Sequence, residues 1–130
     1  MAKVYFCKFT DKKTGKFFYK FGHTTKSDVL ERFDVKYDAR YGEFHIKAIC
    51  SIWGDISWCQ DVEEVYKARY PKNIWLEDFF GDDRKWDNFS GITEIVYMDD
   101  LTYKWAVKSF YQLKESQDKV YKRKESNYGK

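Results

Sequence analysis

Residues 4–33 read VYFCKFTDKKTGKFFYKFGHTTKSDVLERF, and the expected fold follows from this stretch. Residues 3–9 are predicted to form a β-strand with apolar groups on both faces. The aromatic side chains within residues 16–22 fit the pleated, half-buried surface of a second strand. The segment DKKTG at residues 11–15 consists of residue types that favour a tight turn. Because so short a connection joins neighbouring strands in opposite directions, the stretch predicts an antiparallel hairpin.

The second strand ends in a glycine that precedes a predicted short helix. Gly22 allows the backbone to turn or to approach another group closely. Residues 25–28 read TKSD and match a pattern that begins helices, and apolar side chains follow within residues 29–33. Arg32 falls on the flank of that apolar face, where it could point back at the sheet. The sequence therefore predicts a polar corner at which chemistry or phosphate binding could occur.

The chain as a whole predicts an α+β fold with a small antiparallel β-sheet flanked by helices. The other expected elements are a loop at 34–43, a strand at 44–53, a helix at 57–70 before Pro71, a short helix near 74–80, a strand at 91–98 and a helix from Asp99 or Asp100. The apolar content drops from Ser116 onward, which predicts a frayed end. We therefore expect a single domain over residues 1–115 and a basic C-terminal tail over 116–130.

The composition indicates a globular protein. Of the 130 residues, 43% are hydrophobic and 21% are aromatic, which is not the composition of a disordered chain. The three cysteines have no CxxC spacing, so we expect neither a disulfide framework nor a zinc site. With no charged-then-apolar leader and no apolar run of membrane-spanning length, we expect a cytoplasmic protein without a membrane partner.

The net charge of +3 permits a nucleic-acid partner but does not argue for one. The distribution of the charges is more informative than their sum. The N-terminal hairpin and the tail are basic, whereas acidic residues gather at 77–87. That acidic segment either binds Ca²⁺ or is a solvated loop, and it lacks the D-x-D-x-D-G order of a calcium loop.

The predicted helix at 57–70 contains a candidate metal ligand. Helical spacing assigns its buried face to Val62, Val65, Tyr66 and Arg69. At about 100° per residue, Glu63 falls on the flank of that face and Glu64 on the far, solvated side. A carboxylate on the flank is better placed to meet a divalent metal at the sheet corner. The alternative is that Glu63 is an ordinary surface residue.

Other candidate site residues each have a functional and a structural interpretation. Tyr5 and Tyr19 lie on neighbouring strands, where their hydroxyls either orient a water or phosphate or simply belong to sheet packing. Arg32 either holds a phosphate by bidentate bonds or is a solvated surface residue. His23 and His45 are each a general base or a core histidine, and His23 is the better candidate because it follows Gly22.

The chain resembles the GIY-YIG nuclease superfamily, especially its small phage-encoded branch, over roughly residues 3–98. Lys3-Val4-Tyr5 corresponds to the GIY motif, and Lys20-Phe21-Gly22-His23-Thr24 resembles the KIG form of the second motif. Arg32 has the spacing of the family arginine, Glu63 resembles the family glutamate, and Asn88 begins a segment similar to the one that ends such domains. The chain departs from the pattern at Lys3, which replaces a glycine, and at Lys20, which replaces a tyrosine. Tyr19 is one position early, which on a strand turns it to the opposite face.

The resemblance implies Mg²⁺-dependent hydrolysis of DNA phosphodiester bonds. Tyr5, with Tyr19 or His23, would then orient or deprotonate the attacking water, Arg32 would stabilise phosphate charge, and Glu63 would hold the metal. The implied nucleic-acid contacts are Lys3, Lys8, Lys20, Lys26 and Asn88. Two alternatives remain: a catalytically inactive nucleic-acid-binding domain, or a small protein-binding inhibitor or host-takeover factor with exposed aromatic anchors.

Overall fold

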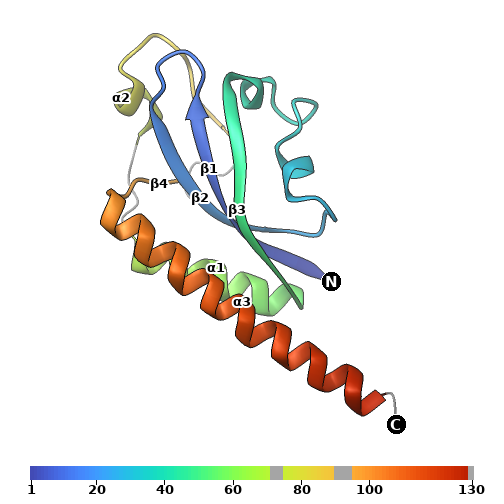
Figure 1. The fold of residues 1–130 in the computed structure, drawn as a ribbon. Coiled ribbons are helices and arrows are strands. Elements are labelled where there is room, and N and C mark those ends of the chain that lie inside the picture. The colour runs from blue at the N-terminus through green and yellow to red at the C-terminus, as the bar shows by residue number, and fades with distance from the viewer. Residues whose placement is uncertain (71–74, 90–94, 129–130) are drawn as a thin grey trace.

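A four-stranded antiparallel sheet is the centre of the molecule. In the computed structural model, which describes residues 1–70, 75–89 and 95–128 and side chains up to residue 123, its strand order is β3-β1-β2-β4 (Figure 1). The strands are β1 (Ala2–Asp11), β2 (Phe17–Thr24), β3 (Phe44–Gly54) and β4 (Ile95–Val96). Helices flank the sheet, so the predicted α+β class is confirmed.

The predicted N-terminal hairpin is present, and both of its strands extend beyond the predicted bounds. Strands β1 and β2 pair from Lys3 opposite Thr24 to Thr10 opposite Phe17. The turn has Gly15 at φ 76°, in the left-handed region that glycine adopts without strain. Its amide donates to the Asp11 carbonyl at 2.8 Å, which closes the turn and sets the register.

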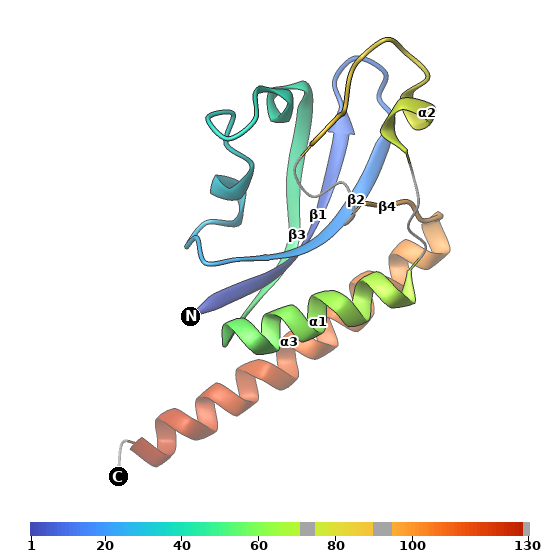
Figure 2. The same cartoon turned by 180° about the vertical axis from the view of Figure 1, so that it is seen from behind.

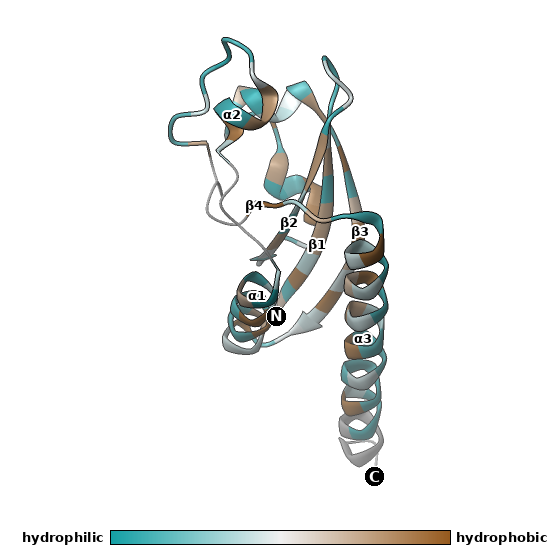
Figure 3. Cartoon of the chain, turned by 90° about the vertical axis from the view of Figure 1, so that its left-hand side faces the viewer, coloured by the Kyte–Doolittle hydropathy of each residue, from teal (hydrophilic) through white to brown (hydrophobic). Residues whose placement is uncertain are grey.

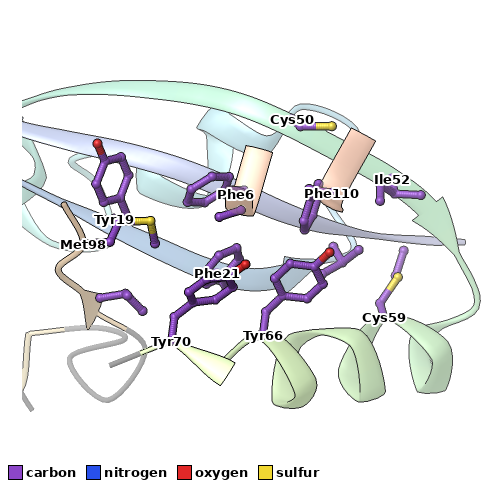
Figure 4. Close-up of a cluster of buried hydrophobic side chains, with 14 residues drawn as sticks. Phe6, Tyr19, Phe21, Cys50, Ile52, Cys59, Tyr66, Tyr70, Met98 and Phe110 are labelled. Atoms are coloured by element: carbon purple, nitrogen blue, oxygen red, sulfur yellow. The ribbon is translucent and has the colours of Figure 1, made fainter. Parts of the chain in front are cut away.

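Both faces of the sheet are covered, which explains why aromatic residues occur on both sides of the hairpin strands. The helix-covered face carries Val4, Phe6 and Phe21 and packs against α1 (Ile56–Arg69) and α3 (Asp100–Tyr128) (Figure 4). The other face carries Cys7 and Phe9 and packs against irregular chain, so we call it the loop-covered face. The two layers are seen from behind in Figure 2.

Two short 3-10 helices and one α-helical turn cover the loop-covered face. These elements are η1 (Val29–Phe33), η2 (Ala39–Glu43) and α2 (Leu76–Phe80). The helix predicted to start within residues 25–28 begins only after Asp28, whose carboxylate accepts from the Leu30 amide at 3.0 Å. Asp28 therefore caps the turn itself, and the helix is a single 3-10 turn. The segment 34–43, predicted as a loop, contains η2.

The buried face of α1 differs from the prediction. Cys59, Glu63 and Tyr66 are buried, whereas Val65 is 51% exposed. Apolar residues are spread around this helix, so spacing alone allowed more than one choice of face. Packing on β1 and β2 selects the face that includes Glu63, which is buried, and Glu64 is exposed as predicted.

The last helix begins where expected and continues further than expected. Asp99 Oδ1 accepts from the Thr102 amide at 2.7 Å and caps α3. The helix does not fray at Ser116 but runs on to Tyr128. The Gln117 side chain donates to the Trp53 carbonyl at 3.2 Å, an anchor that the sequence does not reveal. Figure 3 shows the brown, apolar residues of α3 interrupted by teal, polar ones.

Parts of two predictions fall outside the described residues. Of the strand predicted at 91–98, the structure describes β4, and residues 91–94 lie outside. The short helix predicted near 74–80 corresponds to α2, and residue 74 lies outside. Within the described chain, none of the helices has the length and apolarity needed to cross a lipid bilayer.

Candidate active site

The candidate site is built around Gly22 near the end of β2. Tyr5 on β1 is paired with Gly22, and its side chain lies over this residue on the loop-covered face. A Cβ atom at position 22 would overlap the Tyr5 hydroxyl. Glycine is therefore required for the tyrosine side chain to cross β2. Tyr5 is buried, at 1% exposure.

Three predicted site residues gather around the ring of Phe33 on η1. The Tyr5 ring meets it edge-on at a centroid distance of 5.5 Å. Lys20 Nζ lies 4.9 Å from the same ring, and the Arg32 guanidinium carbon lies at 5.9 Å. Arg32 Nη1 also donates to the Tyr41 hydroxyl at 3.4 Å. The loop-covered face thus collects one phenol, one ammonium and one guanidinium beside Gly22.

Glu63 approaches the adjacent residue of β2 from α1. Its Oε2 lies 3.0 Å from His23 Nδ1, and its side chain is 7% exposed. Lys67, one helical turn later, places Nζ 3.6 Å from Glu63 Oε1. Because Gly22 and His23 are consecutive, the Tyr5 hydroxyl and the Glu63 carboxylate reach the same short segment of β2 from its two sides.

The second tyrosine of the hairpin does not join this group. Tyr19 lies on the helix-covered face (Figure 4). Its ring stacks on Tyr103 of α3 at a centroid distance of 5.1 Å. Strand alternation causes this, since Lys20 occupies the next position and faces the other way. Burial raises the pKa of Tyr19 to about 12, which disfavours its phenolate.

The predicted nucleic-acid contacts are divided between different parts of the surface. Lys3 Nζ donates to the Ser27 carbonyl at 2.6 Å, and Lys26 is exposed close by in the same loop. Lys8 lies on the helix-covered face, 4.2 Å from the ring centroid of Phe17. Asn88, at φ 55°, borders a separate cavity of about 540 Å³ with Trp75 and Trp86. Lys3 and Lys26 thus lie near the candidate site, and Asn88 lines a different cavity.

The lysines of the hairpin turn lie at the far end of β1 from the site. Tyr5 and Asp11 are six residues apart on the strand, or about 20 Å. Lys12 and Lys16 donate to the carbonyls of Gly42 and Phe79, both at 2.9 Å. These basic residues therefore fasten the turn to neighbouring loops.

An ion-pair network at the turn end was not foreseen from the sequence. Arg84 binds Asp11 through both terminal nitrogens, at 2.7 and 2.9 Å, and also contacts Asp82 and Glu43. The Asp11 carboxyl is buried, and its hydrogen bond with Arg84 lowers its pKa to about 2. Asp82, in the segment interpreted as a calcium loop or a solvated loop, is held by Arg84 instead. This network positions loops and has no contact with Gly22 among its described bonds.

Lys67 is the site residue that sequence reasoning missed. Its spacing of four residues from Glu63 is the usual spacing of an ion pair on a helix, and this was the available signal. This spacing marks Lys67 as a site residue only because the Glu63 side chain is buried, and the sequence does not reveal that burial.

The Glu63 carboxylate is the candidate ligand for a divalent cation, and the Lys67 ammonium already lies 3.6 Å from one of its oxygens. The described residues contain no group of three or more His, Cys, Asp or Glu side chains that could together hold a metal ion. Glu63 Oε1 is buried and accepts no hydrogen bond from the described residues. Mg²⁺ binds through one or two carboxylates and completes its shell with water and substrate phosphate. Glu63 would therefore supply one ligand of such an ion, which would have to displace Lys67 and reach a buried oxygen.

Comparison with known proteins gives no match: no family model, no curated protein and no solved structure is similar to this chain. The chemistry of the site is therefore inferred from its own contacts. The contacts form two groups near the end of β2: the Tyr5 hydroxyl lies with Lys20 and Arg32 on the loop-covered face, and Glu63 meets His23 on the helix-covered face.

Proposed function

We propose that this protein is a Mg²⁺-dependent endonuclease of the GIY-YIG type that hydrolyses DNA phosphodiester bonds in the cytoplasm. The observation that carries the proposal is the buried Glu63 carboxylate beside His23, next to the glycine over which the Tyr5 hydroxyl lies. An acid, a histidine and a phenol are among the side chains that can assist phosphodiester hydrolysis by orienting a water, moving a proton or binding a metal.

Each side chain has a role that its position supports. Tyr5 orients the attacking water, whose oxygen forms a bond to phosphorus as the bond from phosphorus to the leaving oxygen breaks. His23, oriented by Glu63, is the base of the scheme, and because it lies on the opposite face of β2 it takes the water proton only if the substrate passes around the end of the strand. Arg32 and Lys20 offset the negative charge that develops on the phosphate oxygens. Mg²⁺ bound at Glu63 would supply further charge neutralisation when present. Tyr19 has no part in this scheme because it packs against α3.

The cytoplasmic location is supported by the state of the cysteines. Cys7, Cys50 and Cys59 are all free thiols and all buried. Burial raises the pKa of Cys7 to about 12. Free thiols are ordinary in a reducing compartment, whereas exported proteins commonly use cysteines in disulfides.

A catalytically inactive nucleic-acid-binding domain is the second candidate. The observation that favours it is Lys67, whose ammonium lies 3.6 Å from the carboxylate oxygen that would hold the metal. A lysine in that place offsets the charge of Glu63 without any metal. The two proposed functions involve the same surface. They differ in whether a metal ion displaces the Lys67 ammonium from the Glu63 carboxylate.

A plasmid-nicking experiment separates the candidates. Purified protein is incubated with supercoiled plasmid over a Mg²⁺ titration, with EDTA as the metal-free arm. We expect nicking by the parent protein and by Glu64→Gln, and at least a 100-fold loss for Glu63→Gln and Arg32→Ala. Glu64 is the matched control because it is adjacent on α1 and exposed.

Absence of cleavage by the parent protein, on the plasmid and on a single-stranded DNA circle alike, with either Mg²⁺ or Mn²⁺ rejects the nuclease. DNA binding that weakens steeply with salt would then support the inactive binding domain. Equal activity of Glu63→Gln and Glu64→Gln would instead show that the active residues lie elsewhere.

A further inference from the structure

Exposed aromatic rings with lysines against them lie at the site end of the sheet. Trp53, at the end of β3, is 45% exposed, and Lys3 Nζ lies 4.4 Å from its ring centroid. Tyr37, between η1 and η2, is 50% exposed, with the ammonium groups of Lys26 and Lys36 at 5.6 and 5.2 Å. We call these five residues the aromatic-lysine rim.

The sheet register places the rim beside the candidate site. Lys3 is paired with Trp53 on one side and with Thr24 on the other. Tyr5 and its partner Gly22 form the next row on the same face, about 7 Å along the strands. The bond from Lys3 to the Ser27 carbonyl ties this row to the loop that carries Lys26. A chain lying over Trp53 and Lys3 would therefore lie beside the row that contains Tyr5, whose side chain is 1% exposed.

The basic end of α3 adjoins the same corner. The Gln117 side chain donates to the Trp53 carbonyl at 3.2 Å, so this part of the helix begins at the rim. Beyond it α3 extends past the sheet (Figure 1), and Lys119, Lys122 and Arg123 are exposed there. Positive charge therefore continues outward from Trp53, which suits a polyanion longer than one nucleotide.

The combination of flat rings and ammonium groups favours unpaired bases. An unstacked base can lie on an exposed Trp or Tyr, and each such contact contributes about 1–3 kcal/mol in single-strand-binding proteins. Bases within an intact duplex are already stacked on each other and offer no free face. The turn lysines that could hold a duplex backbone are instead bonded to loop carbonyls at the other end of β1.

We propose that the aromatic-lysine rim binds single-stranded nucleic acid, with one base stacked on Trp53 and a neighbouring base on Tyr37, while Lys3 and Lys26 hold phosphates. The substrate of the candidate site is then a single strand or an unpaired segment rather than an intact duplex. The statement about substrate rests on the proposed nuclease function, whereas the statement about binding does not.

The chain contains a matched control for this proposal. Trp105 on α3 is 59% exposed, and Lys108 Nζ lies 5.4 Å from its ring. It has the same chemistry as the Trp53–Lys3 pair but belongs to α3 rather than to the strand rows beside Tyr5. If any exposed tryptophan adds to the affinity for a single strand, substitution at either position should weaken binding. If only the rim does, substitution of Trp53 alone should weaken it.

Binding is measured by fluorescence anisotropy without cleavage. Glu63→Gln protein in EDTA is titrated into a labelled 12-nucleotide DNA strand, an RNA strand of the same sequence, and the corresponding duplex. We expect at least 10-fold tighter binding of a single strand than of the duplex, and the two strand arms show whether DNA or RNA is preferred. Trp53→Ala and Tyr37→Ala should each weaken single-strand binding about 5- to 100-fold. Trp105→Ala should leave it unchanged.

Circular dichroism establishes that each variant is folded. Equal affinity for strand and duplex, equal effects of Trp53→Ala and Trp105→Ala, or no binding of any nucleic acid each overturns the proposal. The cleavage experiment tests the nuclease proposal separately. If the protein binds single strands through Trp53 but cleaves no DNA, the rim proposal stands and the nuclease proposal is rejected. If the protein cleaves DNA and Trp53→Ala does not change its single-strand affinity, the nuclease proposal stands and the rim proposal is rejected.

Discussion

The carboxylate of Glu63 on α1 lies 3.0 Å from Nδ1 of His23 on β2, and the glutamate side chain is 7% exposed. The two residues are 40 positions apart in sequence. A carboxylate is buried at low cost only when it is paired or hydrogen-bonded, so this contact and the Lys67 ammonium account for its position. The other carboxylate oxygen, Glu63 Oε1, accepts no hydrogen bond from the described residues.

Replacing Lys67 with methionine should increase the dependence of the fold on divalent metal. Without the ammonium 3.6 Å away, the buried Glu63 oxygen loses its nearest cation, and the variant should be less stable by about 1–3 kcal/mol in EDTA. Mg²⁺ should restore more stability to Lys67→Met than to the parent protein. Thermal unfolding with and without Mg²⁺ measures this, and an equal metal effect in both proteins would exclude a cation at Glu63.

The two hairpin tyrosines should differ sharply in the nicking assay. Tyr5→Phe removes the hydroxyl beside Gly22 and should lower the rate about 100-fold or more. Tyr19→Phe removes a hydroxyl on the helix-covered face, where the Tyr19 ring stacks on Tyr103, and should keep most of the activity. Comparable losses in two folded variants would contradict the role of Tyr5 in orienting the water.

Gly22→Ala should destabilise the protein because the new methyl group overlaps the Tyr5 side chain. Overpacking of this kind costs typically about 1–3 kcal/mol, measurable by urea unfolding. Gly42→Ala is a milder control, since its Cβ would lie 3.3 Å from one methyl of Val35. Combining Gly22→Ala with Tyr5→Ala should cost less than the sum of the single changes. Strict additivity would mean that the Tyr5 ring does not occupy the space over Gly22.

Acid should weaken the attachment of the hairpin turn. Arg84 holds the pKa of buried Asp11 near 2, below its usual 3.8. Because the folded-state pKa is depressed, this stabilisation is present above about pH 4 and is lost as pH falls towards 2. Asp11→Asn should therefore cost about 2 kcal/mol at pH 7. The difference between parent and variant in urea unfolding should shrink between pH 4 and 2, and a difference independent of pH would contradict the ion pair.

Local sequence patterns predicted the hairpin that carries the candidate site, but they did not predict which side of α1 is buried. The apolar and aromatic residues of 3–9 and 16–22, with the turn residues between them, predicted the hairpin, which the structure has. Helical spacing placed Glu63 near the sheet but put Val65 on the buried face, where the structure has it exposed. Spacing orders residues around a helix, whereas the choice of the buried side depends on how the helix docks.

By itself the sequence determined the class of fold, the hairpin and its turn, and the approximate places of α1 and α3, because these depend on periods of two and 3.6 residues. Tertiary structure alone decided that His23 meets Glu63, that Arg84 binds Asp11 from 73 positions away, and that α3 continues past Ser116 beside Trp53. Those contacts join segments distant in the chain, and no local pattern encodes a partner that arrives only when the sheet and helices pack. Gly22 belongs to both groups: its type is visible in the sequence, and the Tyr5 side chain that requires it is visible only in the fold.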